Sequence, residues 1–239
     1  MGTRERRQRE IAEREQLFLG KTRELICQEG LLQVQMARIA EACDYSTGTL
    51  YQHFASKEDL LVALLTDRSE ERIDLFRRAA GWVASPRDRI FAFSAAEVLF
   101  VKRNPEYFRL AQLAQTEVVW TTASKQRREA YLKAIEPACE LALGVVNDAV
   151  AAGDLKLRNA QPEEVALGLW SIVSGTHTLV HTEGLLDFFH VQEPYRAMGR
   201  HIHRLLNGFD WRPLVDVGDD ESCERYVRKV MTEVFGETL

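Results

Sequence analysis

Side chains that suit the recognition of DNA bases are gathered between residues 47 and 53. Thr47, Thr49 and Tyr51 carry hydroxyl groups, and Gln52 carries an amide. Such groups can form hydrogen bonds with base edges and phosphates, and the major groove of DNA is wide enough to admit a helix that carries them. The residue types and their spacing therefore indicate sequence-specific contact with double-stranded DNA.

Two short helices at a sharp angle are expected to position these groups. Ile39, Ala40 and Cys43 fall at helical spacing and predict the inner face of the first helix. Because Ala40 is small, a second helix can cross the first at close range. We expect Asp44 and Tyr45 to form the turn between the two helices.

The second short helix is expected to begin after Ser46, which is a preferred N-cap residue. Leu50 and Phe54 are four residues apart, so both should point inward from one face. The remaining side chains have no evident role in packing, and we expect them to be exposed: Thr47, Thr49, Tyr51, Gln52 and His53.

The stretch from residue 30 to residue 57 resembles the DNA-binding region of the TetR family of bacterial repressors. The resemblance rests on Gly30, on Ile-Ala at 39–40, on the pattern Ser-x-Gly-x-Leu-Tyr-x-His-Phe at 46–54 and on Lys57. It implies an all-α fold: an N-terminal three-helix DNA-binding domain with a helix-turn-helix, followed by a helical ligand-binding and dimerisation domain. We expect these domains at residues 1–56 and 57–208, with a C-terminal extension at 209–239 that holds one helix.

The resemblance also implies which residues touch DNA. Residues near the start of the second short helix would read bases, and flanking residues would fix the register of the protein on phosphates. The implied DNA-binding residues are Gln35, Arg38, Tyr45, Thr47, Gly48, Thr49, Tyr51, Gln52, His53 and Lys57.

Two positions depart from the family pattern. Asp44 stands where the family usually has glycine, but Asp adopts the left-handed backbone of such a turn more readily than most residues do. Its carboxylate would repel phosphate. Gln35 stands where the family commonly has a threonine that caps the first short helix, and glutamine caps poorly. We therefore expect the turn to be kept and the start of the first short helix to be looser.

The charge of the chain restricts how it could bind DNA. Its 239 residues carry a formal net charge of -5, so DNA binding must rely on local basic groups. Two interpretations of an N-terminal arginine cluster stay open. It could be a flexible arm that follows phosphates or enters a minor groove, or a solvated first helix in which Glu10 pairs with Arg14. The cluster comprises Arg4, Arg6, Arg7, Arg9 and Arg14.

Apolar residues recur at intervals of three and four along most of the chain, which predicts helices throughout. The first should run from about Arg6 to Gln28, with Leu17, Leu25 and Ile26 inside and Gly30 as its stop. A long helix should open at Lys57 and continue to about Ala80. Further helices should begin at Ser85-Pro86, Asn104-Pro105, about Ser124, Gln161-Pro162 and Gln192, and a last amphipathic helix should carry Tyr226, Val230 and Val234 on one face.

The hydropathy of the chain and the spacing of its cysteines bear on its cellular location. No apolar run reaches the roughly 18 residues that a membrane span needs, and no segment resembles a signal peptide, so we expect a cytoplasmic protein without membrane contact. The cysteines are far apart, with no spacing typical of zinc or of a disulfide framework. We expect buried thiols, with redox sensing as the alternative, at Cys27, Cys43, Cys139 and Cys223.

By the same resemblance, the helical body would bind a small effector and form a homodimer through Glu163 to Thr182 and Glu193 to Asn207. Glu97 lies on an apolar segment, where a cationic or hydroxylated ligand could pair with it. An ordinary partner, Arg103, Arg109 or Lys102, is the alternative. The candidate effector-binding residues are Phe93, Glu97, Phe100, Tyr107, Phe108, Trp120, Tyr131 and Trp170, although core packing would explain each aromatic residue alone. The candidate dimer-interface residues are Leu167, Trp170, Ser174, Gly175, His177 and His181.

A metal site and an enzyme are both disfavoured. The four-residue spacing of His177 and His181 is one that zinc can use, but no third ligand lies nearby in the sequence, so we expect no metal and no cofactor. A glycine-rich phosphate loop, a Gly-x-Ser-x-Gly elbow and a His-Glu-x-x-His motif are all missing, so no residue is a catalytic candidate.

The resemblance to the TetR family implies a ligand-responsive transcriptional regulator. We expect a repressor that binds a palindromic operator as a dimer and is released by a small, largely apolar effector. The alternative is a helical protein-interaction module with a degenerate DNA-binding head, which the two departures and the acidic net charge would suit.

Overall fold

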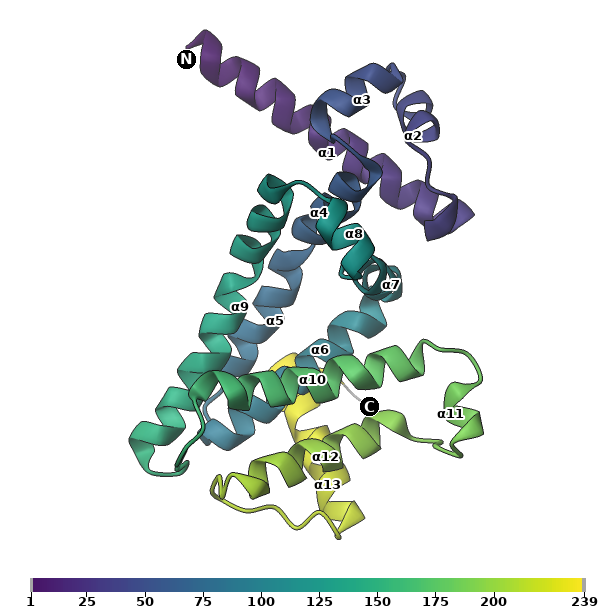
Figure 1. The fold of residues 1–239 in the computed structure, drawn as a ribbon. Helices are drawn as coiled ribbons and strands as arrows, with labels where there is room; N and C mark the ends of the chain where they lie inside the picture. The colour runs from purple at the N-terminus through teal and green to yellow at the C-terminus, as the bar shows by residue number, and fades with distance from the viewer. Residues whose placement is uncertain (1, 238–239) are drawn as a thin grey trace. The chain divides into compact units, whose positions relative to one another are not determined.

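The computed structural model describes residues 2–237, which form helices and connecting segments without any strand (Figure 1). The all-α fold class is therefore confirmed. Two compact units divide the described chain, and each is made of two separate stretches. The first unit comprises the residues up to Ser69 together with Asn104–Ala134. The second comprises Glu70–Arg103 together with the residues from Ile135 onward.

The first unit contains the helix-turn-helix predicted from the sequence. It is built from α1 (Thr3–Glu29), a short 3-10 helix (Leu31–Gln33), α2 (Met36–Ala42), α3 (Thr47–His53), α4 (Lys57–Asp67), α7 (Pro105–Ala114), α8 (Glu117–Thr122) and the start of α9 (Lys125–Ala152). Helix α1 ends at Gly30, whose φ of 91° lies in the region that favours glycine. Phe18, Leu25 and Ile26 of α1 are buried, but Leu17 is 48% exposed, so its predicted place inside is wrong.

The second unit contains α5 (Ser69–Ala80), α6 (Pro86–Arg103), the rest of α9, α10 (Pro162–Val180), α11 (Leu185–Phe188), α12 (Pro194–Gly208), α13 (Asp220–Val230) and a π-helical turn (Met231–Phe235). Helices α10 and α12 pack along each other, and α6 contacts both. A Cβ added to Gly168 of α10 would lie 3.2 Å from Leu205 Cδ2 of α12, so glycine permits this close approach. Helix α13 packs on α6 and α12, with Val230 buried and Tyr226 half-buried, and Val234 of the π-helical turn is also buried.

The single helix predicted from Lys57 to about Ala80 is wrong, because the chain leaves the helix at Arg68. The hydroxyl of Ser69 donates to the carbonyl oxygen of Thr66 at 2.7 Å, and the hydroxyl of Thr66 donates to the carbonyl oxygen of Val62 at 3.1 Å. Short hydroxyl side chains compete in this way with the backbone hydrogen bonds of a helix. The result is two helices, α4 and α5, in place of one.

Several helix boundaries follow from local signals. Ser85 caps α6 by accepting a hydrogen bond from the amide of Asp88 at 3.1 Å, and α7 and α10 begin at Pro105 and Pro162 as predicted. Pro137 lies within α9. Helices α8 and α11 were not predicted, because elements this short show no periodic pattern.

A buried arginine ties α6 to α12 in the second unit. Arg87 is fully buried, and its guanidinium donates hydrogen bonds to the carbonyl oxygen of Trp211, to that of His203 at 3.3 Å and to Asn207 Oδ1 at 2.7 Å. Asn207 in turn bonds to the backbone of Val215, at 2.8 and 3.2 Å. Burial lowers the pKa of Arg87. These bonds hold the segment after α12 against the start of α6.

The exposure of the cysteines and the apolar length of the helices can be compared with the expectations from the sequence. Cys43 and Cys223 are buried, but Cys27 and Cys139 are exposed, so the expectation of buried thiols is wrong for the latter two. Within the part of the chain that the structure describes, no helix is both long enough and apolar enough to cross a membrane.

Candidate functional site

The helix-turn-helix has the predicted core. Ile39, Ala40, Leu50 and Phe54 are at most 1% exposed, and Cys43 is 8% exposed. Burial raises the pKa of the Cys43 thiol. Both short helices thus bury the apolar face that their spacing predicted, which fixes the direction of the outward faces.

The turn between α2 and α3 depends on Asp44, whose φ is 58°. The left-handed conformation predicted for Asp44 is therefore confirmed. The amide of Asp44 donates to the carbonyl oxygen of Glu41 at 3.0 Å, and that of Tyr45 donates to the carbonyl oxygen of Ala40 at 2.9 Å. These two bonds close the turn and set the angle at which α3 leaves it.

Helix α3 is capped as predicted. The hydroxyl of Ser46 accepts a hydrogen bond from the amide of Thr49 at 3.1 Å and lies 2.9 Å from the hydroxyl of Thr49. On the outer side of α3, Tyr51 is 49% exposed and Gln52 and Gly48 are exposed, while Thr47 and Thr49 are half-buried. A Cβ on Gly48 would have only the Ser46 hydroxyl within 4 Å, so this end of α3 is open.

The predicted exposure of His53 is wrong. Its side chain is 5% exposed, its ring lies edge-on to Phe18 with 5.3 Å between centroids, and its Nδ1 lies 4.0 Å from Glu15 Oε2. Burial lowers the pKa of His53. The reason is its spacing of three residues from Leu50, which places both on the inner face of α3.

Three further residues predicted to contact DNA, Tyr45, Gln35 and Lys57, differ in their contacts and burial. The ring of Tyr45 meets Phe18 edge-on, and the Arg14 guanidinium lies 5.4 Å from the Tyr45 ring centroid. Gln35 occupies the N-cap of α2 without a side-chain cap hydrogen bond, as predicted, and Lys57 is half-buried at the start of α4.

Basic groups near the helix-turn-helix are partly neutralised. Arg38 pairs with Glu29 at 3.2 Å and with Glu41 at 3.4 Å, both on the surface, and these carboxylates raise the pKa of its guanidinium. The N-terminal arginines belong to α1, which is helical from Thr3, so the interpretation as a flexible arm is wrong. The ion pair in this stretch joins Arg6 to Glu10 at 2.8 Å, and not Glu10 to Arg14 as predicted.

The helix-turn-helix lies in a stretch that matches a known protein family. Residues 18–64 match the family model described as "Bacterial regulatory proteins, tetR family". This stretch therefore resembles the DNA-binding domain of TetR-family regulators. The chain is 37% identical over 60 residues to the HTH-type transcriptional regulator UidR of Escherichia coli (strain K12) and 45% identical over 62 residues to the HTH-type transcriptional repressor KstR of Rhodococcus jostii (strain RHA1).

These matches span less than a third of each relative. They cover 25% and 26% of this chain, and 31% and 29% of UidR and KstR respectively. The fold extends further: the transcriptional regulator FadR from Bacillus subtilis, solved in complex with stearoyl-CoA, matches with a TM-score of 0.60 and 14% identity, over 81% of this chain and 98% of FadR. The fold of this chain therefore resembles that of FadR over most of its length, although few residues are identical.

Substitution of Asp44 tests the backbone conformation of the turn between α2 and α3. Asp44→Ala should lower the free energy of unfolding by about 1 kcal/mol, because Ala tolerates the left-handed region less well than Asp. Asp44→Asn should leave stability within about 0.5 kcal/mol, since Asn also adopts this conformation. Urea denaturation followed by circular dichroism measures both.

The two Asp44 variants also separate the effect of the backbone conformation from the effect of the carboxylate charge. Asp44→Asn removes the carboxylate and keeps the backbone, so it should raise the affinity for an operator several-fold if DNA lies against this turn. Equal stability of the Ala variant and the parent chain would contradict the argument from backbone conformation.

The carboxylate proposed for effector binding has a partner inside the chain. Glu97 Oε2 lies 2.7 Å from Arg72 Nε, and both side chains are about 15% exposed. The partner is therefore Arg72 and not the predicted Arg103, Arg109 or Lys102. A cationic ligand would have to compete with this ion pair.

The aromatic residues predicted to line an effector cavity have packing roles. Phe93 packs against Phe76 with 4.8 Å between ring centroids, and Phe100 is fully buried. In the first unit, Trp120 and Tyr131 meet edge-on at 5.7 Å, the hydroxyl of Tyr107 donates to the carbonyl oxygen of Leu65 at 3.4 Å, and Phe108 is half-buried. Trp170 is 51% exposed. Core packing thus accounts for most of this set.

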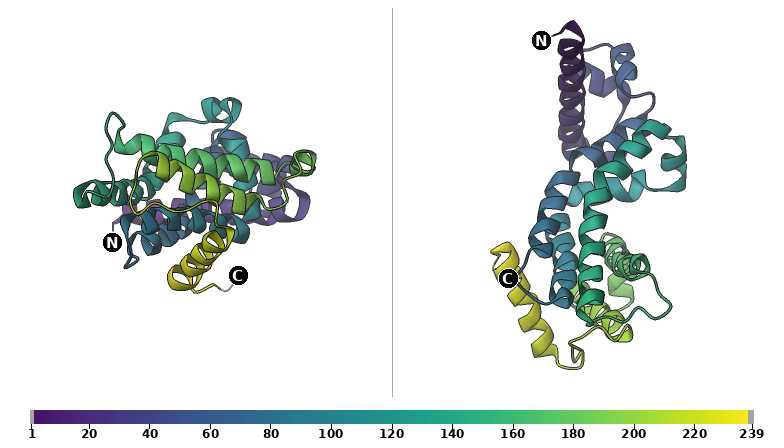
Figure 2. Two further views of the ribbon diagram at one scale, coloured as in Figure 1. Left: turned by 90° about the horizontal axis from the view of Figure 1, so that it is seen from below. Right: turned by 90° about the vertical axis from the view of Figure 1, so that its left-hand side faces the viewer.

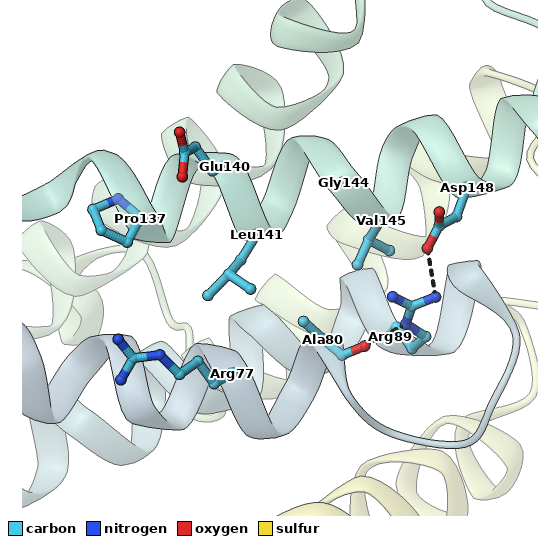
Figure 3. A pocket seen from close by; sticks show the side chains of 9 residues that line it. All are labelled: Arg77, Ala80, Arg89, Pro137, Glu140, Leu141, Gly144, Val145 and Asp148. Atoms are coloured by element: carbon cyan, nitrogen blue, oxygen red, sulfur yellow. Dashed lines mark hydrogen bonds and ion pairs between the residues drawn. The ribbon is translucent and has the colours of Figure 1, made fainter.

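A cavity of about 360 Å³ lies between α5, α6 and α9 of the second unit. Leu141 and Val145 point from α9 toward this space, and Arg89 Nη1 bonds to Asp148 Oδ2 at 2.8 Å (Figure 3). Pro137 and Gly144 contribute little side-chain volume on the same helix, which leaves the space open. None of the residues predicted to bind an effector lines this cavity.

His177, in the last turn of α10, and His181, the residue that caps this helix, differ in burial. His177 is fully buried, and its Nδ1 lies 3.2 Å from the hydroxyl of Tyr195. Burial lowers the pKa of His177 to about 4. Its predicted place at a dimer interface is wrong, because it continues the buried row of Val165, Leu169 and Val173 at four-residue spacing.

The outward face of α10 carries apolar and small residues. Leu167 is 56% exposed, Gly175 is exposed, and Ser174 and His181 are half-buried. Between residues 2 and 237, no three His, Cys, Asp or Glu side chains are grouped so that they could hold a metal ion.

Proposed function

We propose that this chain is a ligand-responsive transcriptional regulator of the TetR family. It would bind a palindromic operator as a homodimer and act as a repressor that a small, largely apolar effector releases. The observation that carries the proposal is α3 itself: a capped helix on a rigid turn, with Gly48, Tyr51 and Gln52 exposed on the side away from its core. The proposed division of labour is residues 1–56 for DNA, 57–208 for effector and dimer, and 209–239 as an extension.

Base contacts would come from the outer side of α3, and phosphate contacts from its flanks. Thr47, Gly48, Thr49, Tyr51 and Gln52 would meet base edges. Gln35, Arg38, Tyr45 and Lys57 would fix the register. His53 would contribute through packing of α3 against α1, because its imidazole is buried against Phe18.

The dimer follows from the geometry of DNA. Two recognition helices must enter major grooves about 34 Å apart, or a multiple of that distance, so two copies related by a two-fold axis need a palindromic site. The outward face of α10, with Leu167 and Trp170 about half exposed, supplies an apolar surface for the second copy.

The effector would act by a population shift. A ligand that binds one conformation of the dimer more tightly moves the equilibrium by its differential affinity, and by no more than that. FadR, which shares the fold, was solved with stearoyl-CoA, and KstR, which shares the DNA-binding region, is named a repressor. These two proteins support a repressor with an apolar effector.

Selection of bound duplexes from a random DNA pool, at near-physiological salt, tests the proposal. The purified chain should enrich a palindrome, and the logarithm of its affinity should fall with the logarithm of salt concentration by about 0.9 for each phosphate contact. Tyr51→Ala should relax specificity at one base position if Tyr51 reads a base, at a cost of about 1–3 kcal/mol.

A matched control comes from an exposed residue outside the helix-turn-helix. Leu132→Ala on α9 removes a side chain that is 52% exposed and should leave operator binding unchanged. If the folded chain enriches no sequence, the proposal fails and the protein-interaction module becomes the better description.

A further inference from the structure

A second cavity, of about 570 Å³, lies in the second unit between α6, α12 and α13. Its size falls within the range of small-molecule sites. Helix α13, drawn in yellow in Figure 2, packs against both α6 and α12. Apolar side chains from all three helices and from the π-helical turn line the cavity, among them Phe91, Val98, Leu99, Met198, Val227 and Met231.

A buried histidine without a hydrogen-bond partner lines this cavity. His203 is 1% exposed, its ring stacks on Phe91 with 4.5 Å between centroids, and Tyr226 meets it edge-on at 5.0 Å. Neither ring nitrogen of His203 has a hydrogen-bond partner among the described residues. Burial lowers its pKa to about 4, so at pH 7 the ring offers one N–H donor and one acceptor nitrogen. Buried polar atoms are nearly always satisfied, so a group of this kind points to a ligand.

The charged residues of the lining favour an anion. Four cationic side chains face two carboxylates, Glu193 and Glu224. Both carboxylates are bound to Arg196, at 2.8 and 2.9 Å. The ammonium group of Lys102, at the end of α6, lies over the ring of Tyr195 at 5.7 Å, and Arg228 is exposed on α13.

We propose that the cavity between α6, α12 and α13 binds an elongated apolar carboxylate that carries a hydroxyl or carbonyl group at its other end. The apolar walls hold the chain of the ligand, the carboxylate lies near Lys102 and Arg228, and the polar group bonds to the ring of His203. Because α13 forms one wall, the ligand also holds this helix against α6 and α12. None of the residues predicted as effector ligands from the sequence lines this site.

The length of the ligand follows from α6. Phe91, which stacks on His203, lies about 16 Å from Lys102 along the helix axis at the usual rise of an α-helix. The probe ω-hydroxydodecanoate has an extended chain of about this length. Dodecanoate lacks its hydroxyl and dodecanol lacks its carboxylate, so the three probes separate the two polar ends.

Isothermal titration calorimetry of the full chain without DNA tests the site. The chain should bind ω-hydroxydodecanoate about tenfold more tightly than dodecanoate, the usual value of one good hydrogen bond in a buried site. His203→Phe keeps the stacking on Phe91 and removes both nitrogens, so this preference should fall to about onefold. Dodecanol should bind more weakly than ω-hydroxydodecanoate.

A cavity-filling pair locates the binding. Val98→Trp places an indole in the cavity and should weaken the binding of ω-hydroxydodecanoate by more than about tenfold. Val83→Trp adds the same side chain at a position that is 98% exposed and outside the lining, and should leave binding unchanged. Each of three results overturns the proposal. The chain binds none of the probes, Val98→Trp binds ω-hydroxydodecanoate as tightly as the parent chain does, or His203→Phe still prefers ω-hydroxydodecanoate to dodecanoate about tenfold. Since the titration contains no DNA, its failure leaves the operator test standing.

Discussion

Trp170→Glu is expected to convert the proposed dimer to monomers and to abolish binding of the proposed operator. Trp170 is 51% exposed on the outward face of α10, beside Leu167, and a large aromatic residue at such a position is the type that dominates interface energetics. A buried carboxylate there would lack a partner, so the dimer dissociation constant should rise by more than about a hundredfold. Sedimentation velocity at micromolar concentration and a mobility-shift assay on the selected operator measure the two effects.

The control for this variant is Val83→Glu, which adds the same charge at a residue that is 98% exposed between α5 and α6. It should remain dimeric and bind the operator with parental affinity. If Trp170→Glu also remains dimeric, the second copy does not bind through this face of α10, and the proposed interface is withdrawn.

Arg87→Met should destabilise the second unit by about 3 kcal/mol. Methionine replaces the stem of the arginine, but the carbonyl oxygen of Trp211 and Oδ1 of Asn207 lose a donor in a buried site. The segment after α12 then loses its attachment to the start of α6. Urea denaturation at fixed protein concentration measures the change in the unfolding midpoint.

An exposed arginine provides the comparison. Arg77 is 49% exposed and pairs with Glu70 and Asp74 on the surface of α5, so Arg77→Met should change the unfolding midpoint far less than Arg87→Met does. Equal effects of the two substitutions would mean that the buried hydrogen bonds of Arg87 do not stabilise the fold.

The helix-turn-helix could be predicted because its determinants are local. The cap at Ser46, the inner face through Leu50 and Phe54 and the turn at Asp44 each depend on residues a few positions apart. Even here, His53 was misplaced, although its spacing from Leu50 already puts it on the inner face. Local signals give the direction of each face only when every residue of the face is counted.

The second unit could not be predicted in the same detail, because its decisive contacts join distant residues. Glu97 was singled out from its apolar segment, but its partner Arg72 lies 25 residues away, so spacing within a helix could not identify it. Arg87 follows a helix-starting proline, a position that is usually solvated, and its burial depends on Trp211, 124 residues later. The cavity that includes His203 needs three separate stretches of chain to meet.

The exposed cysteines allow the two units of the unmodified chain to be labelled, one label in each unit. Each unit has one exposed cysteine, Cys27 on α1 and Cys139 on α9, and one buried cysteine, Cys43 or Cys223. Burial raises the pKa of Cys43, so its thiolate is scarce and alkylates slowly. Two fluorophores or spin labels can therefore be attached at Cys27 and Cys139 without mutagenesis. A change in the distance between the two labels on adding DNA or an effector would show that the two units move relative to one another.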